Sequence, residues 1–111
     1  MKIKQYDLYM ANLSPAKGTE AGKTRPVVII QTDLLNDSHP STIICPITTN
    51  VKMDIELLRV HLTTLETEIA SDILVDQMRA IDNKRLLNKI GTLTKSQQQK
   101  LRQNIQIILD L

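Results

Sequence analysis

The chain has 111 residues, of which 41% are hydrophobic and 23% are charged, and its formal net charge is +2. These values are typical of a small globular protein, so we expect one domain over residues 1–111. No uninterrupted apolar run exceeds five residues, which excludes a membrane-spanning helix. The N-terminal residues lack the apolar core of a signal peptide, and Cys45 is the single cysteine. We therefore expect a cytoplasmic protein that does not bind membranes.

Five segments in the first two thirds of the chain are predicted to be β-strands. They are rich in β-branched residues and are separated by turn-forming residues or polar linkers. The predicted strands cover residues 6–13, 26–31, 41–48, 55–62 and 73–78. Short strands without helical crossovers between them favour a strongly curved antiparallel barrel over an α/β sheet.

A short helix is predicted after the last of these strands. Asp82 is a suitable N-cap, Leu86, Leu87 and Ile90 follow with helical spacing, and Gly91 would end the helix at its C′ position.

A second helix is predicted at the C-terminus. The segment Thr94-Lys95-Ser96-Gln97 matches a capping box, and apolar residues then recur with helical spacing as far as Leu109. We expect a mainly β fold with a C-terminal α-helix.

The segment GTEAGKT, residues 18–24, superficially resembles a nucleotide-binding loop. A P-loop has four residues between its first glycine and the Gly-Lys pair, but only three residues separate Gly18 from Gly22. A P-loop also leads into a helix, whereas this segment leads into Arg25, Pro26 and a β-branched strand. The sequence therefore argues against a nucleoside triphosphatase.

Few residues stand out as chemical groups when each is considered alone. His39 and His61 have no cysteine or acidic partner at metal-ligand spacing, so we expect no metal site and no cofactor. Local sequence favours a surface ion pair for Arg25 with Glu20 or Asp7, and turn formation for the two threonines that end the third predicted strand.

Three segments taken together indicate a family. The run N-L-S-P-A-K-G-T-E-A-G-K-T-R-P-V-V-I-I-Q (12–31), the run C-P-I-T-T (45–49) and the run D-Q-M-R-A-I-D (76–82) resemble the MazF/PemK/Kid family of toxin ribonucleases. The resemblance implies a small SH3-like β-barrel of the CcdB/Kid/MazF type. It also implies a homodimer, metal-independent cleavage of single-stranded RNA, and inhibition by a cognate MazE-like antitoxin.

The resemblance also assigns roles to individual residues. Arg25 matches the family's catalytic arginine, and Thr48 matches the threonine that hydrogen-bonds the scissile phosphate. Glu20 and Asp76 match acidic positions, with Asp76 as a candidate general base. The expected RNA-binding residues are Lys17, Lys23, Thr24, Thr49, Gln77 and Arg79.

Two alternatives to an active ribonuclease remain open at this level. The same fold serves gyrase-poisoning proteins of the CcdB type, although those are not expected to carry the set Arg25, Thr48 and Asp76. A non-catalytic relative that binds only antitoxin is the other alternative. The segment VKMDIELLRVHLTT, residues 51–64, matches the family poorly, so the sequence does not identify an RNA cleavage motif.

Overall fold

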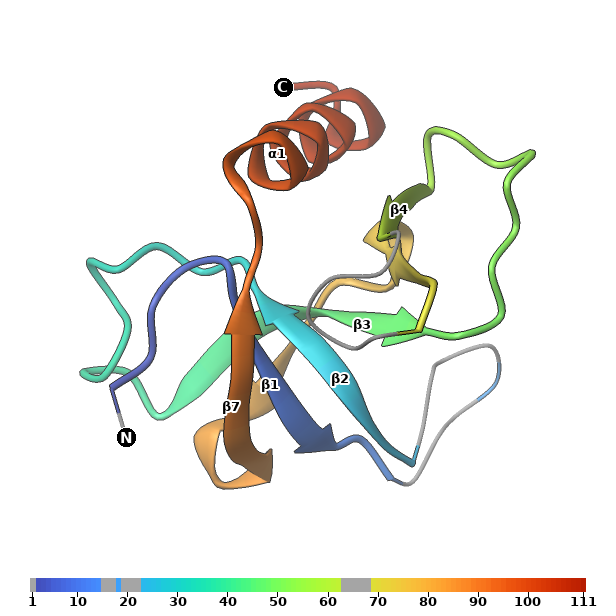
Figure 1. Ribbon diagram of the computed structural model, residues 1–111. Coiled ribbons are helices and arrows are strands. Elements are labelled where there is room, and N and C mark those ends of the chain that lie inside the picture. The colour runs from blue at the N-terminus through green and yellow to red at the C-terminus, as the bar shows by residue number, and fades with distance from the viewer. Residues whose placement is uncertain (1, 15–17, 19–22, 63–68) are drawn as a thin grey trace.

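The computed structural model describes residues 2–14, 18, 23–62 and 69–111 (Figure 1). Lys17 and Glu20 lie outside these residues. Strands and helices follow one another in the order β1 (Asp7–Asn12), β2 (Thr24–Ile29), β3 (Ser41–Thr48), β4 (Arg59–Leu62), β5 (Ser71–Leu74), the 3₁₀ turn η1 (Val75–Gln77), β6 (Arg79–Asp82), the 3₁₀ turn η2 (Asn83–Arg85), β7 (Leu86–Thr92) and α1 (Lys95–Leu109).

The strands form a 7-stranded antiparallel sheet in the order β4-β5-β3-β2-β1-β7, with β6 paired to β3. β3 is the branching point, because its first half pairs with β6 and its last two residues, Ile47 and Thr48, pair with β5. Helix α1 crosses one side of the curved sheet near β4 (Figure 1). The predicted mainly β fold with a C-terminal helix is confirmed.

Both faces of the central strands are buried. In β2, Val28 belongs to a cluster that packs against α1 through Leu101, whereas Val27 and Ile29 belong to a second cluster on the other side of the strand. Successive side chains of a strand point to opposite faces, so a strand buried on both sides needs an unbroken apolar run. This explains the Val-Val-Ile-Ile sequence that follows Arg25-Pro26.

The short helix predicted from Asp82 to Gly91 is wrong. Asp82 does cap a turn, since its side chain accepts a hydrogen bond from the backbone N–H of Lys84, but that turn is only η2. The chain then forms β7, which pairs antiparallel with β1. Strand pairing supplies backbone partners along the edge of β1, and it overrides a local helical pattern of only a few apolar residues.

Two of the predicted strands are shorter than expected. The segment 55–62 becomes a strand only from Arg59, and the segment 73–78 leaves the strand conformation after Leu74. The turn η1 follows, and Val75 within it is buried and donates its backbone N–H to the carbonyl of Leu58. Val75 therefore uses its apolar side chain as a core residue without continuing the strand.

The C-terminal helix is confirmed, including its capping box. Thr94 Oγ1 accepts the backbone N–H of Gln97 at 3.3 Å, and the side chain of Gln97 accepts the backbone N–H of Thr94 at 2.8 Å. Leu101 is fully buried against the sheet, which anchors the helix. Within the part of the chain that the structure describes, no helix has the length and apolar character needed to cross a membrane.

Candidate active site

Strand register brings the two principal predicted catalytic residues to one end of the sheet. In the antiparallel pair β2–β3, Val27 lies opposite Pro46. Arg25 is two residues before Val27, and Thr48 is two residues after Pro46. The β2–β3 ladder ends at the Val27–Pro46 pair, so Arg25 and Thr48 follow from the same end of that ladder, each two residues beyond it. Both side chains are half-buried.

The surroundings of Arg25 are polar and exposed. Lys23 and Thr24 precede it at the beginning of β2, and both are exposed. Lys23 has a positive φ of 66°. Its backbone N–H donates to Ser14 Oγ at 3.0 Å, and its backbone carbonyl accepts the N–H of Leu13. Two cations therefore lie at the beginning of β2, Lys23 just before the strand and Arg25 two residues further along the chain.

Thr48 is the last residue of β3, and its hydroxyl is held by the turn that follows. Its Oγ1 accepts the backbone N–H of Asn50 at 3.1 Å. A hydroxyl that accepts one hydrogen bond still carries a hydrogen to donate. On the β5 side, Thr48 lies opposite Asp72. Thr49 follows Thr48 and is exposed.

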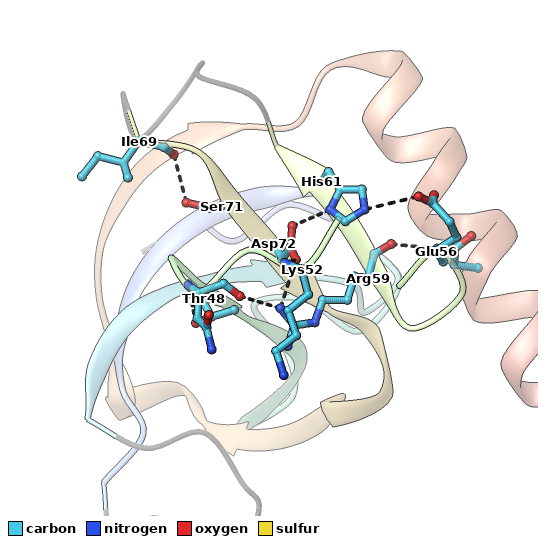
Figure 2. Close-up of polar contacts among 10 residues, drawn as sticks. Thr48, Lys52, Glu56, Arg59, His61, Ile69, Ser71 and Asp72 are labelled. Atoms are coloured by element: carbon cyan, nitrogen blue, oxygen red, sulfur yellow. Dashed lines mark hydrogen bonds and ion pairs between the residues drawn. The ribbon is translucent and has the colours of Figure 1, made fainter. Parts of the chain in front are cut away.

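Asp72 is the centre of a buried polar network beside Thr48 (Figure 2). Its side chain is 0% exposed. Oδ2 accepts the backbone N–H of Lys52 at 2.9 Å and Arg59 Nη1 at 3.0 Å, and Oδ1 lies 2.6 Å from His61 Nδ1. Burial by itself would raise the pKa of Asp72, but the hydrogen bonds from Lys52, His61 and Arg59 outweigh it and lower that pKa below its usual value.

Arg59 connects this network to the turn after Thr48. Its Nη1 also donates to the backbone carbonyl of Asn50 at 2.6 Å. Thr48 therefore holds the N–H of Asn50 while Arg59 holds its carbonyl, and Asp72 holds the N–H of Lys52. Side chains from β3, β4 and β5 thus restrain the backbone of residues 48–52.

Sequence reasoning missed Asp72, Arg59 and His61 as a group. Arg59 and His61 are two residues apart in β4, so their side chains share a face, and His61 lies opposite Asp72 in the β4–β5 pair. A charged residue and a histidine alternating within an apolar strand is the one signal that the sequence offers. Asp72 is eleven residues from His61 in the chain, so spacing along the sequence gives no sign of this pair.

The remaining predicted residues that the structure describes lie in η1 and β6. Asp76 and Gln77 are in η1, where Asp76 is exposed. Burial raises the pKa of the Cys45 thiol to about 12, and the negative charge of Asp76 contributes to that rise. Arg79 pairs with Ile44 in the β3–β6 ladder, four residues before Thr48, which corresponds to roughly 13 Å along a strand.

The candidate site therefore combines residues 23–25, at the beginning of β2, with Thr48 and Thr49, at the end of β3. This group offers cations and hydroxyl donors, which are the partners of a phosphate group. Among the described residues, no three His, Cys, Asp or Glu side chains gather closely enough to hold a metal ion.

Comparisons with known proteins agree on one family. Residues 4–109 match the family described as PemK-like, MazF-like toxin of type II toxin-antitoxin system. The endoribonuclease EndoA of Bacillus subtilis is 35% identical over 113 aligned positions, which cover 100% of this chain and 97% of EndoA.

Solved structures show the same fold. MazF of Deinococcus radiodurans superimposes with a TM-score of 0.87 at 20% identity, covering 100% of this chain and 99% of the other. A MazE–MazF crystal structure from the same organism gives a TM-score of 0.80 at 20% identity, covering 100% and 98%.

Proposed function

Because the chain belongs to the PemK-like, MazF-like family of type II toxins, we propose that its Arg25–Thr48 site cleaves single-stranded RNA without a metal ion. The chain is an endoribonuclease of this family, as are the full-length relatives that it matches. The observation that carries the proposed site is the register of β2 and β3. That register brings a guanidinium and a hydroxyl to one end of the β2–β3 ladder, next to exposed Lys23, Thr24 and Thr49.

The proposed reaction uses the RNA's own 2′-hydroxyl as the nucleophile. Its oxygen attacks the adjacent phosphorus, the bond from phosphorus to the 5′-oxygen breaks, and the products are a 2′,3′-cyclic phosphate and a 5′-hydroxyl. Arg25 stabilises the additional negative charge on the phosphorane, and Thr48 donates a hydrogen bond to a phosphate oxygen. Half-burial of both side chains strengthens these interactions relative to bulk water.

Two protons must move in this reaction. One leaves the 2′-hydroxyl, and the other reaches the 5′-oxygen as it departs. For the first transfer we propose Asp76 or Glu20 as general base. Asp76 is exposed on η1. For the second transfer we propose that Arg25 donates a proton to the departing 5′-oxygen and regains one from solvent water.

The proposed partners are single-stranded RNA, a MazE-like antitoxin and a second copy of the chain. A polyanionic RNA and an acidic antitoxin segment would both suit the cations at the beginning of β2.

For the dimer we propose a two-fold pairing to which the β3 end and α1 contribute. On α1, Ile107 and Leu109 are each 50% exposed, and Leu111 beyond it is 84% exposed, which provides apolar surface for such contact. Sedimentation showing only monomer at micromolar concentration would contradict the dimer.

Incubation with RNA in EDTA tests the proposed function. We expect the wild-type chain to cleave a 5′-labelled single-stranded RNA of mixed sequence in excess EDTA and to leave 2′,3′-cyclic phosphate and 5′-hydroxyl ends. Thr48→Val keeps the shape of the side chain and removes its hydroxyl, so cleavage should fall at least tenfold. Thr92→Val, which removes a hydroxyl on β7, is the matched control and should cleave normally. RNA that stays intact with wild-type protein would favour the antitoxin-binding or gyrase-binding alternatives.

A further inference from the structure

We propose that Asp72, with Arg59 and His61, is a positioning group that fixes Thr48 and the turn at residues 48–52 for RNA cleavage. This inference deepens the proposed function and depends on it. Asp72 is not assigned a part in the chemical step, since it acts on the reaction only through the residues that it holds.

The three strands align the participants in one row. Thr48 lies opposite Asp72 in the β3–β5 pair, and Asp72 lies opposite His61 in the β4–β5 pair. Residues directly opposite one another in a sheet project to the same face. Thr48, Asp72 and His61 therefore share one face across three neighbouring strands, and Figure 2 shows the imidazole of His61 turned toward the Asp72 carboxylate.

The turn after Thr48 is held at successive backbone groups. The Asn50 N–H is bound by Thr48 Oγ1, its carbonyl by Arg59 Nη1, and the Lys52 N–H by Asp72 Oδ2. The first of these bonds fixes the Thr48 hydroxyl itself, because a rotation of that side chain would break it. If Arg59 or Asp72 lost its hydrogen bonds, the Asn50 backbone would be less restrained. The Thr48 hydroxyl would then no longer be held in one orientation.

Burial and charge make this network rigid. The side chain of Asp72 is 0% exposed and that of Arg59 is 13% exposed, so the ion pair at 3.0 Å is largely shielded from water. A buried carboxylate must be paired and hydrogen-bonded to be tolerated, and here it receives a backbone N–H, a guanidinium and an imidazole. If any one of these donors is removed, the buried Asp72 carboxylate is left with an unsatisfied hydrogen-bonding position.

His61 acts as the second support of Asp72. Since the carboxylate is ionised and accepts at 2.6 Å, the imidazole donates from Nδ1, which defines its tautomer when neutral. The other nitrogen, Nε2, lies 3.7 Å from Glu56 Oε1, in the segment before β4. Among the described residues Nε2 has no hydrogen-bond partner, so the bond from Nδ1 to Asp72 is what orients the ring.

Asp72→Asn tests the inference, with Asp54→Asn as control. Asp54 is exposed in the same connection between β3 and β4, so the control makes the same charge change without touching the network. We expect Asp72→Asn to lower kcat by about tenfold to a hundredfold, because a misplaced Thr48 would orient the phosphate less well. KM for RNA should change little. Amide hydrogen exchange at Asn50 and Lys52 should accelerate at least about tenfold, because their N–H groups lose restraint.

A pair of substitutions at His61 separates positioning from general stability. His61→Asn retains a donor close to the place of Nδ1 and should keep most of kcat, whereas His61→Ala should reproduce the loss seen with Asp72→Asn. If Asp72→Asn does not fold, this pair carries the test with the same two measurements.

Several results would overturn the inference. It is wrong if Asp72→Asn retains wild-type kcat, if Asp54→Asn causes the same loss, or if His61→Asn and His61→Ala behave alike. A wild-type chain that cleaves no RNA would contradict the proposed function, and the catalytic part of the inference would fall with it. Amide exchange would still show whether Asp72 restrains the turn, so the two failures can be told apart.

Discussion

Two buried aspartates in this small protein have different surroundings. Asp72 on β5 is 0% exposed and accepts hydrogen bonds on both oxygens, from Lys52, Arg59 and His61. Asp7 on β1 is 4% exposed, and its Oδ1 accepts Thr92 Oγ1 at 2.9 Å and lies 3.4 Å from Lys89 Nζ. Among the described residues, Asp7 Oδ2 has no hydrogen-bond partner.

The two aspartates hold different parts of the fold. The partners of Asp7 are side chains on β7, and Lys89 is 50% exposed, so this ion pair is screened by water. It adds a contact between two strands that already pair. Asp72 instead holds the backbone of a turn that follows a predicted catalytic residue. We therefore expect changes around Asp72 to affect activity and stability, and changes around Asp7 to have smaller effects on both.

The largest expected effect is on RNA cleavage, when the cation of the proposed site, Arg25, is compared with the cation beside Asp7, Lys89. Arg25→Ala should lower kcat/KM for RNA cleavage by about a hundredfold to a thousandfold, because it removes a charge that stabilises the phosphorane. Lys89→Ala, which removes the cationic partner of Asp7, should leave kcat/KM within about twofold. Cleavage by Arg25→Ala at nearly the wild-type rate would return Arg25 to the role of a surface ion-pair residue.

The next effect concerns the free energy of unfolding. Asp72→Asn should lower it by about 3 kcal/mol, since Arg59 then loses its buried partner charge. Asp7→Asn should lower it by less than about 1 kcal/mol, because one of its oxygens contributes no hydrogen bond in the described structure. Urea unfolding of both variants measures the two values. Equal losses would remove the distinction between the two aspartates.

A smaller, pH-dependent effect should be specific to Asp72. Its pKa is lower in the folded chain than in the unfolded chain, so the folded state binds fewer protons. Its pH-dependent stabilisation is therefore complete above the usual aspartate pKa of about 3.9, and it is lost as the pH falls through the lowered value. The advantage of wild-type protein over Asp72→Asn in urea unfolding should be smaller at pH 3 than at pH 7. An advantage that grows on acidification would contradict the assigned network.

The smallest expected effect lies at the exposed beginning of β2. Lys23→Glu should weaken RNA binding and antitoxin binding by roughly fivefold each, because an exposed charge contributes little and is screened by salt. Isothermal titration calorimetry at low and high salt measures both affinities, and Lys84→Glu on η2 is a matched control. ATP and GTP should bind neither wild type nor Lys23→Glu. Unchanged affinity for both partners would remove Lys23 from the site.

Much of the architecture could be predicted because local and tertiary preferences agree there. The capping box at Thr94, the spacing that buries Leu101, and the Val-Val-Ile-Ile run all point to the elements that the structure contains. Prediction failed for residues 86–92, where a few apolar residues have a helical spacing but the edge of β1 requires a paired strand. Pairing between segments so far apart in the chain leaves no local signal.

The candidate site could be predicted only in part for the same reason. Arg25 and Thr48 carry recognisable flanking motifs, so each could be found along the chain. Arg59, His61 and Asp72 are joined by strand register across β4 and β5, and Arg59 and His61 lie in the segment 51–64, where the sequence matches the family poorly. Which side chains gather around a buried carboxylate follows from that register, which the sequence did not reveal.

Binding of an RNA that cannot be cleaved tests the location of the site most directly. Replacing every 2′-hydroxyl by 2′-O-methyl removes the nucleophile, so amide chemical shifts can be followed by NMR during titration of wild-type protein. We expect the largest shift changes at residues 23–25 and 48–52, and small ones at Asp7 and at residues 89–92. Changes concentrated around Asp7 and β7, with none at Arg25 or Thr48, would contradict the placement of RNA cleavage at this end of the sheet.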